Sequence, residues 1–290
     1  MTETIIRTSR PSRLREFLYP ASMLDSLARH RDLIAQFTSR EVLERHKGAY
    51  LGVAWNILNP LITLTIYTFV FGYVLKSRWQ QAESTHDLSG TTVAFVLPFF
   101  VGHALFHFFS ECINRAPTVV ASRPNFVRKV VFPVEILPVV SVLSGAVYPL
   151  VCIPCLLIAQ LVIIGHIPAT ALLLPIVVLP LALICFGLSW FLASVGVFLR
   201  DSRHVIVVLT QLLMFLTPVF YPIELIPESW RGLYRLNPLA IVIENARAVA
   251  LWGTQPNWLE LGILIILSAA CAQLGFAYFM KTKRGLSDVV

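Results

Sequence analysis

The stretch that decides the fold runs from Ile136 to Leu199 and reads ILPVVSVLSGAVYPLVCIPCLLIAQLVIIGHIPATALLLPIVVLPLALICFGLSWFLASVGVFL. It contains no Asp, Glu, Lys or Arg. A transmembrane helix needs about 20 predominantly apolar residues, so the run is long enough for two. Gly165-His166-Ile167-Pro168 supplies turn-forming residues between them, and we expect the helical hairpin to close there.

Four further apolar runs lie outside this stretch, which gives six predicted spans in all. They are Leu51–Leu75, Thr91–Ser110, Val205–Ile223 and Leu261–Met280. The whole chain is 57% hydrophobic and only 13% charged, whereas a soluble domain carries about 25% charged residues. Because the runs are continuous rather than short and alternating, a transmembrane β-barrel is excluded. The predicted fold class is an all-α polytopic membrane protein with six transmembrane helices.

The distribution of basic residues predicts the orientation of these spans. An even number of spans places both termini on one side, and most of the 23 Lys and Arg residues then fall on that same side. Cytoplasmic loops carry an excess of Lys and Arg, so we expect both termini to be cytoplasmic, in a cell inner membrane. The net charge of +7 is explained in the same way, and nucleic acid is not an expected partner.

The parts of the chain outside the spans are too small for a soluble domain. We divide the chain into a cytoplasmic or interfacial segment (1–48), a transmembrane domain (49–280) and a cytoplasmic tail (281–290). Met23, Leu27, Ile34 and Phe37 recur at helical spacing, which predicts an amphipathic helix on the inner membrane surface. A small solvated helix is the alternative.

Two connections between spans have their own predicted structure. The inner loop Asn114–Pro133 has the length of a short helix parallel to the membrane, where a cytoplasmic partner could bind it. The outer segment Glu224–Trp258 alternates apolar pieces with prolines and charges, which excludes a simple span. Short helices that dip into the outer leaflet are expected there.

Catalytic motifs are missing from the sequence. No GxxxxGK[ST] phosphate loop occurs, so the chain is not expected to hydrolyse ATP in that way. The spans carry almost no ionisable residues, which indicates that any transport energy comes from outside this chain. His103, His107 and Glu111 form a row on one helix face. The row suits a polar pathway, an interfacial cluster or an incomplete metal site, and we predict no metal, cofactor or catalytic residue in this chain.

Aromatic residues concentrate in the first, second and fifth spans. A sugar chain could slide past such rings, because its C–H-rich faces stack without strong fixed hydrogen bonds. The alternative is interface belts plus ordinary packing. The predicted conduit leaves the third and fourth spans peripheral. Its candidate residues are Trp55, Tyr67, Phe71, Phe99, Phe100, His103, Phe106, His107, Phe215 and Tyr221.

An ordered set of short blocks resembles the permeases of type-2 ABC exporters, in the branch that exports lipid-linked polysaccharides such as O antigen, capsule and teichoic acid. The blocks are REVLERHKGAYLGVAWNILNP (Arg40–Pro60), FVRKVVFPVEILP (Phe126–Pro138), FLRD (Phe198–Asp201), TPVFYP (Thr217–Pro222) and NPL (Asn237–Leu239), followed by Arg247. Thr217 stands where the family often has Ser. No block covers the first 22 residues.

The resemblance implies a working unit of two permeases and two ATPases, in which the ATPase subunits bind ATP and Mg. The inner loop would be the coupling helix on the ATPase, with Asn114, Arg115, Arg123, Asn125 and Arg128, and Met23–Lys47 would be the interfacial helix. The implied substrate is a polyprenyl-diphosphate glycan within membrane lipid. Its anionic headgroup could bind Lys and Arg side chains at the inner surface. The alternative explanation for these residues is the usual excess of positive charge on the cytoplasmic side. These candidates are Arg40, Arg45, Lys47, Arg200 and Arg203.

Three alternatives remain open from the sequence. The first is a type-2 ABC permease for drugs or small lipids. The second is a membrane enzyme that acts on lipid-linked sugars, although its only acidic cluster, Glu224, Glu228 and Glu244, shows no paired-carboxylate spacing. The third is a membrane scaffold.

Overall fold

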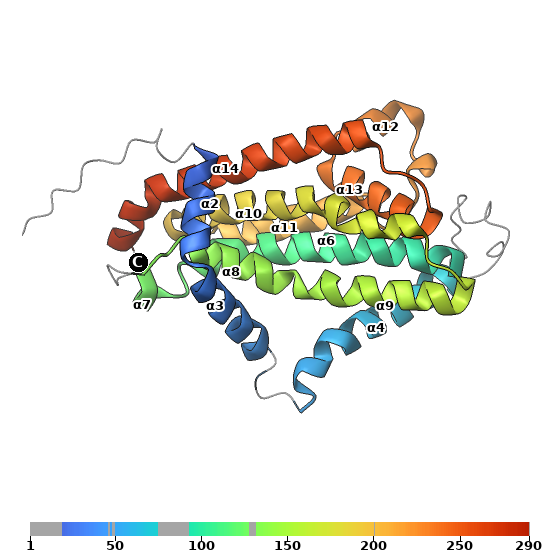
Figure 1. Ribbon diagram of the computed structural model, residues 1–290, viewed down its shortest axis with the longest axis horizontal. Coiled ribbons are helices and arrows are strands. Elements are labelled where there is room, and N and C mark those ends of the chain that lie inside the picture. Colours follow the sequence, from blue (N-terminus) through green and yellow to red (C-terminus); the bar gives the residue numbers. More distant parts are fainter. Residues whose placement is uncertain are drawn as a thin grey trace, which may run out of the picture.

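The computed structural model describes residues 19–45, 47, 50–74, 93–127, 132–199 and 201–289. These residues form helices and no strand. The long helices run side by side along the molecule (Figure 1). We call the two ends of this bundle the α7 end and the α12 end. The main helices are α4 (Trp55–Tyr67, continued by the π-helical η2, Thr68–Val74), α6 (Val93–Val119), α8 (Ile136–Gly145), α9 (Val147–Ile164), α10 (Leu174–Phe198), α11 (Ser202–Leu216) and α14 (Trp258–Val289).

The uncharged run folds as the sequence predicts. Its first half forms α8 and α9 with a small break at Ala146, and its second half forms η3 (Ala169–Leu173) and α10. Gly165 ends α9 with a φ of 85°, a left-handed conformation that glycine adopts without steric cost. The predicted hairpin between these two halves is therefore confirmed.

Four helical segments are long and apolar enough to cross a membrane. They are Phe95–Val119, Ile136–Ile164, Ala169–Phe198 and Trp258–Lys283. The predicted first and fifth spans are shorter apolar helices, Trp55–Phe71 and Ser202–Leu216. Six membrane crossings therefore remain a prediction. The predicted tail boundary at 281 also falls inside a helix, because α14 continues to Val289.

Helix α10 is the centre of the bundle, which corrects the expectation that the fourth span is peripheral. It packs against both α6 and α14. The backbones approach so closely that a Cβ at Gly275 would lie 2.1 Å from the carbonyl oxygen of Gly187, and one at Gly196 would lie 2.0 Å from that of Pro117. Small residues at helix contacts permit this approach within a membrane. Helix α9, in contrast, leaves Leu150 and Val162 exposed.

The N-terminal helices α2 (Pro20–Arg29) and α3 (Arg31–Glu44) cross the α7 end at an angle to the bundle (Figure 1). The predicted apolar face, Met23, Leu27, Ile34 and Phe37, does not lie free for lipid. It packs on a core cluster that includes Val120, Ile136 and Trp190. The short α7 (Pro124–Val127) follows α6 at the same end.

The α12 end is built from short helices. They are η4 (Ile223–Leu225), α12 (Glu228–Arg235), α13 (Pro238–Arg247) and the π-helical η5 (Ala248–Trp252). Asn237 caps α13, since its side-chain oxygen accepts a hydrogen bond from the Leu239 N–H. Arg247 is fully buried and donates hydrogen bonds to the carbonyls of Pro98, Pro218 and Val219 at 2.8–3.0 Å. This one guanidinium therefore joins α13 to α6 and to the turn after α11.

Candidate functional site

A polar cavity of about 850 Å³ opens between α4, α6 and α9, inside an otherwise apolar bundle. Buried or lipid-facing polar groups are costly in a membrane protein and usually mark a function. The cavity is therefore the leading candidate for the functional site. Its lining residues are Arg45, Trp55, Asn56, Asn59, Ile62, Thr63, Ile66, Tyr67, His103, His107, Ser110, Glu111, Asn114 and Tyr148.

One helix face supplies much of the wall. His103, His107, Glu111 and Asn114 follow each other at spacings of four, four and three along α6, so they point to the same side. The His107 ring stacks on Tyr148 of α9, with ring centroids 3.8 Å apart. Tyr67 of α4 lies 5.7 Å from His103, centroid to centroid. The three helices α4, α6 and α9 therefore contact one another through the rings of tyrosine and histidine side chains.

Behind these rings lies an aromatic cluster formed by Phe71, Phe95, Phe99 and Phe220. Phe71 and Phe99 each stack on Phe220, with centroids 5.5 and 5.6 Å apart. Tyr67 connects the cavity wall to this cluster, because its ring lies 4.8 Å from that of Phe99. Aromatic pairs at such distances stabilise one another, so the wall is firmly packed.

The opposite part of the cavity is charged. Arg45, at the end of α3, places its Nη1 2.7 Å from Oε1 of Glu111 and donates through Nη2 to the Ser144 hydroxyl at 2.9 Å. Burial is the main reason that the pKa of Arg45 is lowered. The positive charge of Arg45 is balanced by the Glu111 carboxylate.

We call the charged part of the cavity, at Arg45 and Glu111, its mouth. Beside this mouth, Glu41 joins α3 to the end of α6. Its carboxylate is buried and accepts hydrogen bonds from Arg115 and Ser144 and, at 2.8 Å, from Arg123. Burial alone would raise the pKa of Glu41, but the hydrogen bond from Arg123 and the charge of Arg115 outweigh it and hold the pKa below 4.5. Glu41 is thus a charged group at the centre of a network between two helices.

The predicted headgroup cations are not one cluster. Of the described members, only Arg45 lines the cavity. Arg40 is exposed and pairs with Glu44 at 2.7 Å, while Lys47 and Arg203 are exposed elsewhere. Arg200 lies outside the described residues.

The predicted conduit residues divide into three groups. Trp55, Tyr67, His103 and His107 line the cavity, and Phe71 and Phe99 pack directly behind it. Phe100 and Phe106 do not line the cavity, because both side chains are buried in the main core.

Phe215 and Tyr221 also lie away from the cavity. Phe215 is exposed on α11, and the Tyr221 hydroxyl donates to the Phe215 carbonyl and lies 3.1 Å from that of Tyr234. The two residues therefore belong to the turn after α11 rather than to the cavity wall.

The predicted coupling residues lie in different surroundings, and their role stays a prediction. Asn114 and Arg115 continue α6 and face inward: Asn114 accepts a hydrogen bond from Thr210 of α11 at 2.9 Å, and Arg115 pairs with Glu41. Arg123 pairs with Glu41 as well. Only Asn125, in α7, is exposed at the surface, and Arg128 lies outside the described residues.

Sequence reasoning missed Tyr148, the asparagines of α4 and Phe220. Tyr148 is the single aromatic residue between Ile136 and Cys185, and that isolation was a usable signal. Among the residues that the structure describes, no group of three or more His, Cys, Asp or Glu could hold one metal ion.

Comparison with known proteins gives a family. The family described as ABC-2 type transporter matches residues 32–251. An O-antigen export system permease protein RfbA of Klebsiella pneumoniae is 27% identical over 89% of this chain and 95% of its own length. One from Myxococcus xanthus is 27% identical over 78% of this chain and 83% of its own length. The polysialic acid transport protein KpsM of Escherichia coli is 24% identical over 85% of this chain and 92% of its own length.

Proposed function

The chain belongs to the ABC-2 type transporter family, and on that premise we propose that it is the membrane-spanning permease of a polysaccharide exporter. Relatives that span nearly the whole chain are named as O-antigen and polysialic acid transport proteins, which supports a polysaccharide over a drug or a small lipid. The substrate we infer is O antigen on a polyprenyl diphosphate, exported across the cytoplasmic membrane. ATP and Mg are bound by a separate ATPase subunit, and this chain carries no cofactor.

The observation that carries the proposal is the composition of the cavity between α4, α6 and α9. Its rings, Trp55, Tyr67 and Tyr148, offer faces on which sugar C–H groups stack. Its amides, Asn56 and Asn59, offer both donors and acceptors to sugar hydroxyls. A substrate made of many neutral polar units suits this wall better than a hydrophobic drug does.

We assign the α7 end to the cytoplasm, with six membrane crossings and both termini inside. The basic residues near that end support the assignment. The ATPase would bind there, where α7 presents Asn125 at the surface. The charged mouth of the cavity then faces the side on which the lipid-linked glycan is made, and Arg45 is the cation best placed to meet its diphosphate.

The mechanism follows from these positions. The diphosphate competes with Glu111 for Arg45 and loosens the contact between α3 and α6. ATP binding to the partner moves the α7 end of two copies of the chain and widens the path between them. The glycan then advances along the rings without a strong fixed contact that would stop it.

The test is a deletion strain that carries the gene on a plasmid, with surface polysaccharide and intracellular lipid-linked glycan measured in the same samples. We expect loss at the surface together with accumulation inside. Loss of both would instead support a membrane enzyme of glycan synthesis. No change in either would overturn the polysaccharide substrate and favour a small-molecule exporter.

A further inference from the structure

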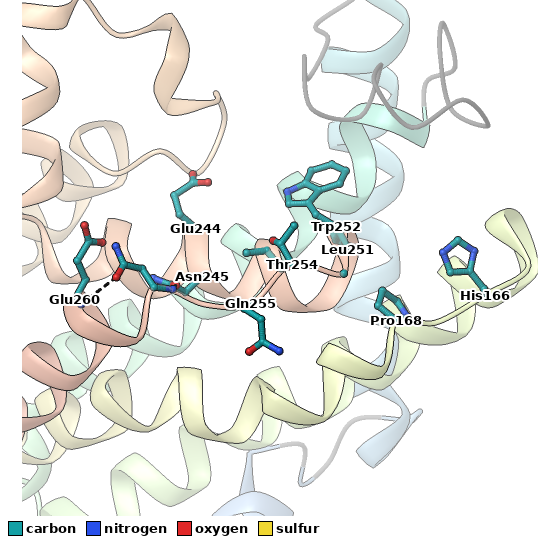
Figure 2. Close-up of a pocket in the computed structure, with 12 residues that line it drawn as sticks. His166, Pro168, Glu244, Asn245, Leu251, Trp252, Thr254, Gln255 and Glu260 are labelled. Atoms are coloured by element: carbon teal, nitrogen blue, oxygen red, sulfur yellow. Dashed lines mark hydrogen bonds between the residues drawn. The ribbon is translucent and has the colours of Figure 1, made fainter.

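A second polar cavity, of about 630 Å³, lies at the α12 end between η3, α13, η5 and the start of α14. Figure 2 shows Glu244, Asn245 and Glu260 on one side of it and Trp252 with His166 on the other. None of its lining residues is Lys or Arg. Its polar groups are two carboxylates, three amides, an indole, an imidazole and a hydroxyl: Glu244, Glu260, Asn245, Gln255, Asn257, Trp252, His166 and Thr254.

The two carboxylates differ in their partners. Glu244 places Oε1 2.7 Å from Nη1 of the fully buried Arg247, so its charge is balanced inside the protein. Glu260 is exposed and forms no ion pair with the residues that the structure describes. A ligand in this cavity therefore meets one uncompensated negative charge.

An apolar groove of about 400 Å³ begins at the same Glu260 and follows α14 toward the α7 end. Ile263, Leu267 and Cys271 line it on α14, and Ile184 and Ile241 line it from α10 and α13. At 1.5 Å per residue, the distance from Glu260 to Cys271 is about 16 Å. One leaflet of a bilayer has a hydrocarbon layer of about 15 Å, so the groove has the length of a single leaflet.

We propose that the groove and the polar cavity together bind one phospholipid with a primary-amine headgroup, taken from the leaflet at the α12 end. The acyl chain lies along α14, and the ammonium group donates hydrogen bonds to Glu260. Trp258, half exposed and two residues before Glu260, is the residue type that is enriched where a protein meets the surface of a bilayer. The site goes beyond the export function, because its lipid is retained rather than transported.

Charge and position select this occupant over other lipids. An anionic phosphatidylglycerol would bring its net charge to Glu260 with no cation in the cavity lining to offset it. The substrate cavity lies beside α4, on the opposite side of the bundle from α14 in Figure 1. The groove is thus separate from the proposed export path.

The test is native mass spectrometry of the purified full chain with equal amounts of phosphatidylethanolamine, phosphatidylcholine and phosphatidylglycerol that carry identical acyl chains. We expect phosphatidylethanolamine to be retained preferentially. Glu260→Gln should lower its retention about tenfold, because a charge-assisted hydrogen bond is lost. Glu260→Asp should keep most of it, and Glu228→Gln, an exposed acid outside both cavities, is the matched control and should change nothing.

Three outcomes would overturn the proposal. The first is phosphatidylglycerol retained as well as phosphatidylethanolamine. The second is a Glu260→Gln variant that retains lipid like the wild type. The third is phosphatidylcholine retained as well as phosphatidylethanolamine, which would mean that the site does not recognise a primary amine. None of these readouts depends on export, so each is independent of the proposed function.

Discussion

Arg45 is the residue at which structure and proposed function meet. It is only partly exposed, and its Nη1 lies 2.7 Å from Oε1 of Glu111. Arg45 can therefore act on export in two ways, through this ion pair or through its positive charge alone. Arg45→Gln should reduce export strongly, because the mouth then lacks its cation and Glu111 keeps only its longer contact with Arg115, at 3.4 Å. Surface polysaccharide of the complemented strain measures this, with protein level in the membrane measured in parallel.

A double variant separates the two explanations. Arg45→Gln with Glu111→Gln removes both charges and leaves no uncompensated carboxylate. We expect export to stay low, since the cation is the functional group. Recovery of export in the double variant would show instead that Arg45 matters only as a partner of Glu111. Arg40→Gln is the control, because Arg40 is an exposed cation on the same helix outside the cavity.

Gly102 reveals how little space surrounds Arg247. A Cβ at Gly102 would lie 2.6 Å from the Nη2 atom that donates to the Val219 carbonyl. Gly102→Ala should therefore displace the guanidinium and lower stability by about 1–3 kcal/mol, the usual cost of overpacking. Thermal unfolding in detergent measures it. Gly262→Ala in α14 has nothing within 4 Å of its Cβ and should leave the melting temperature unchanged or slightly raised.

At the scale of elements, the buried carboxylate of Glu41 joins α3 to the end of α6, in addition to the Arg45–Glu111 pair. Glu41→Gln removes the carboxylate that pairs with Arg123 and leaves Arg115 with only its longer contact to Glu111, at 3.4 Å. A broken buried pair costs about 3–5 kcal/mol, and the partial exposure of both arginines should bring the loss to the low end. We expect proteolysis of α2 and α3 to become faster. Glu44→Gln breaks only an exposed pair with Arg40 and should have little effect.

The pH dependence of this contact has a definite sign. The pKa of Glu41 is lowered from 4.5, so its stabilising contribution is present above pH 4.5 and is lost as pH falls through the lowered value. Proteolysis of α2 and α3 should therefore be constant between about pH 5 and pH 8. A rise in cleavage between pH 7 and pH 6 would contradict this expectation.

The elements that sequence predicted well are those with a continuous apolar pattern. The run Ile136–Leu199 forms two helical segments of membrane-spanning length with a turn at Gly165, as its length and its turn residues predict. The position of α10 at the centre could not be predicted, since it depends on which glycines face each other across helices. The ion pair of Arg115 could not be predicted for a similar reason: its partner Glu41 lies 74 residues away in the sequence.

The candidate site was predicted only in part. Helical spacing placed His103 and His107 on one face, and that face lines the cavity. The burial of Phe100 and Phe106 in the main core could not be predicted, because aromatic residues occur in cavity walls as well as in packed cores. Sequence reasoning placed Arg45 in one group with Arg40, Lys47 and Arg203. Arg45 differs from them because it lines the cavity and pairs with Glu111, a residue distant in the sequence.

At the scale of the whole molecule, α4 and α11 leave apolar faces exposed beside the open side of the cavity, as expected for a homodimer interface. Exposed residues include Ile62 and Ile66 on α4 and Leu212 on α11. Ile62 and Ile66 also line the cavity, so a second copy would complete its wall. Ile66→Cys and Leu212→Cys, introduced separately, should each give cross-linked dimers in membranes with a short bifunctional thiol reagent, because equivalent residues meet at a two-fold axis. Ile266→Cys, exposed on α14, is the matched control and should stay monomeric on the gel. If Ile266→Cys cross-links and the other two do not, the dimer would form through α14, and the cavity would face lipid.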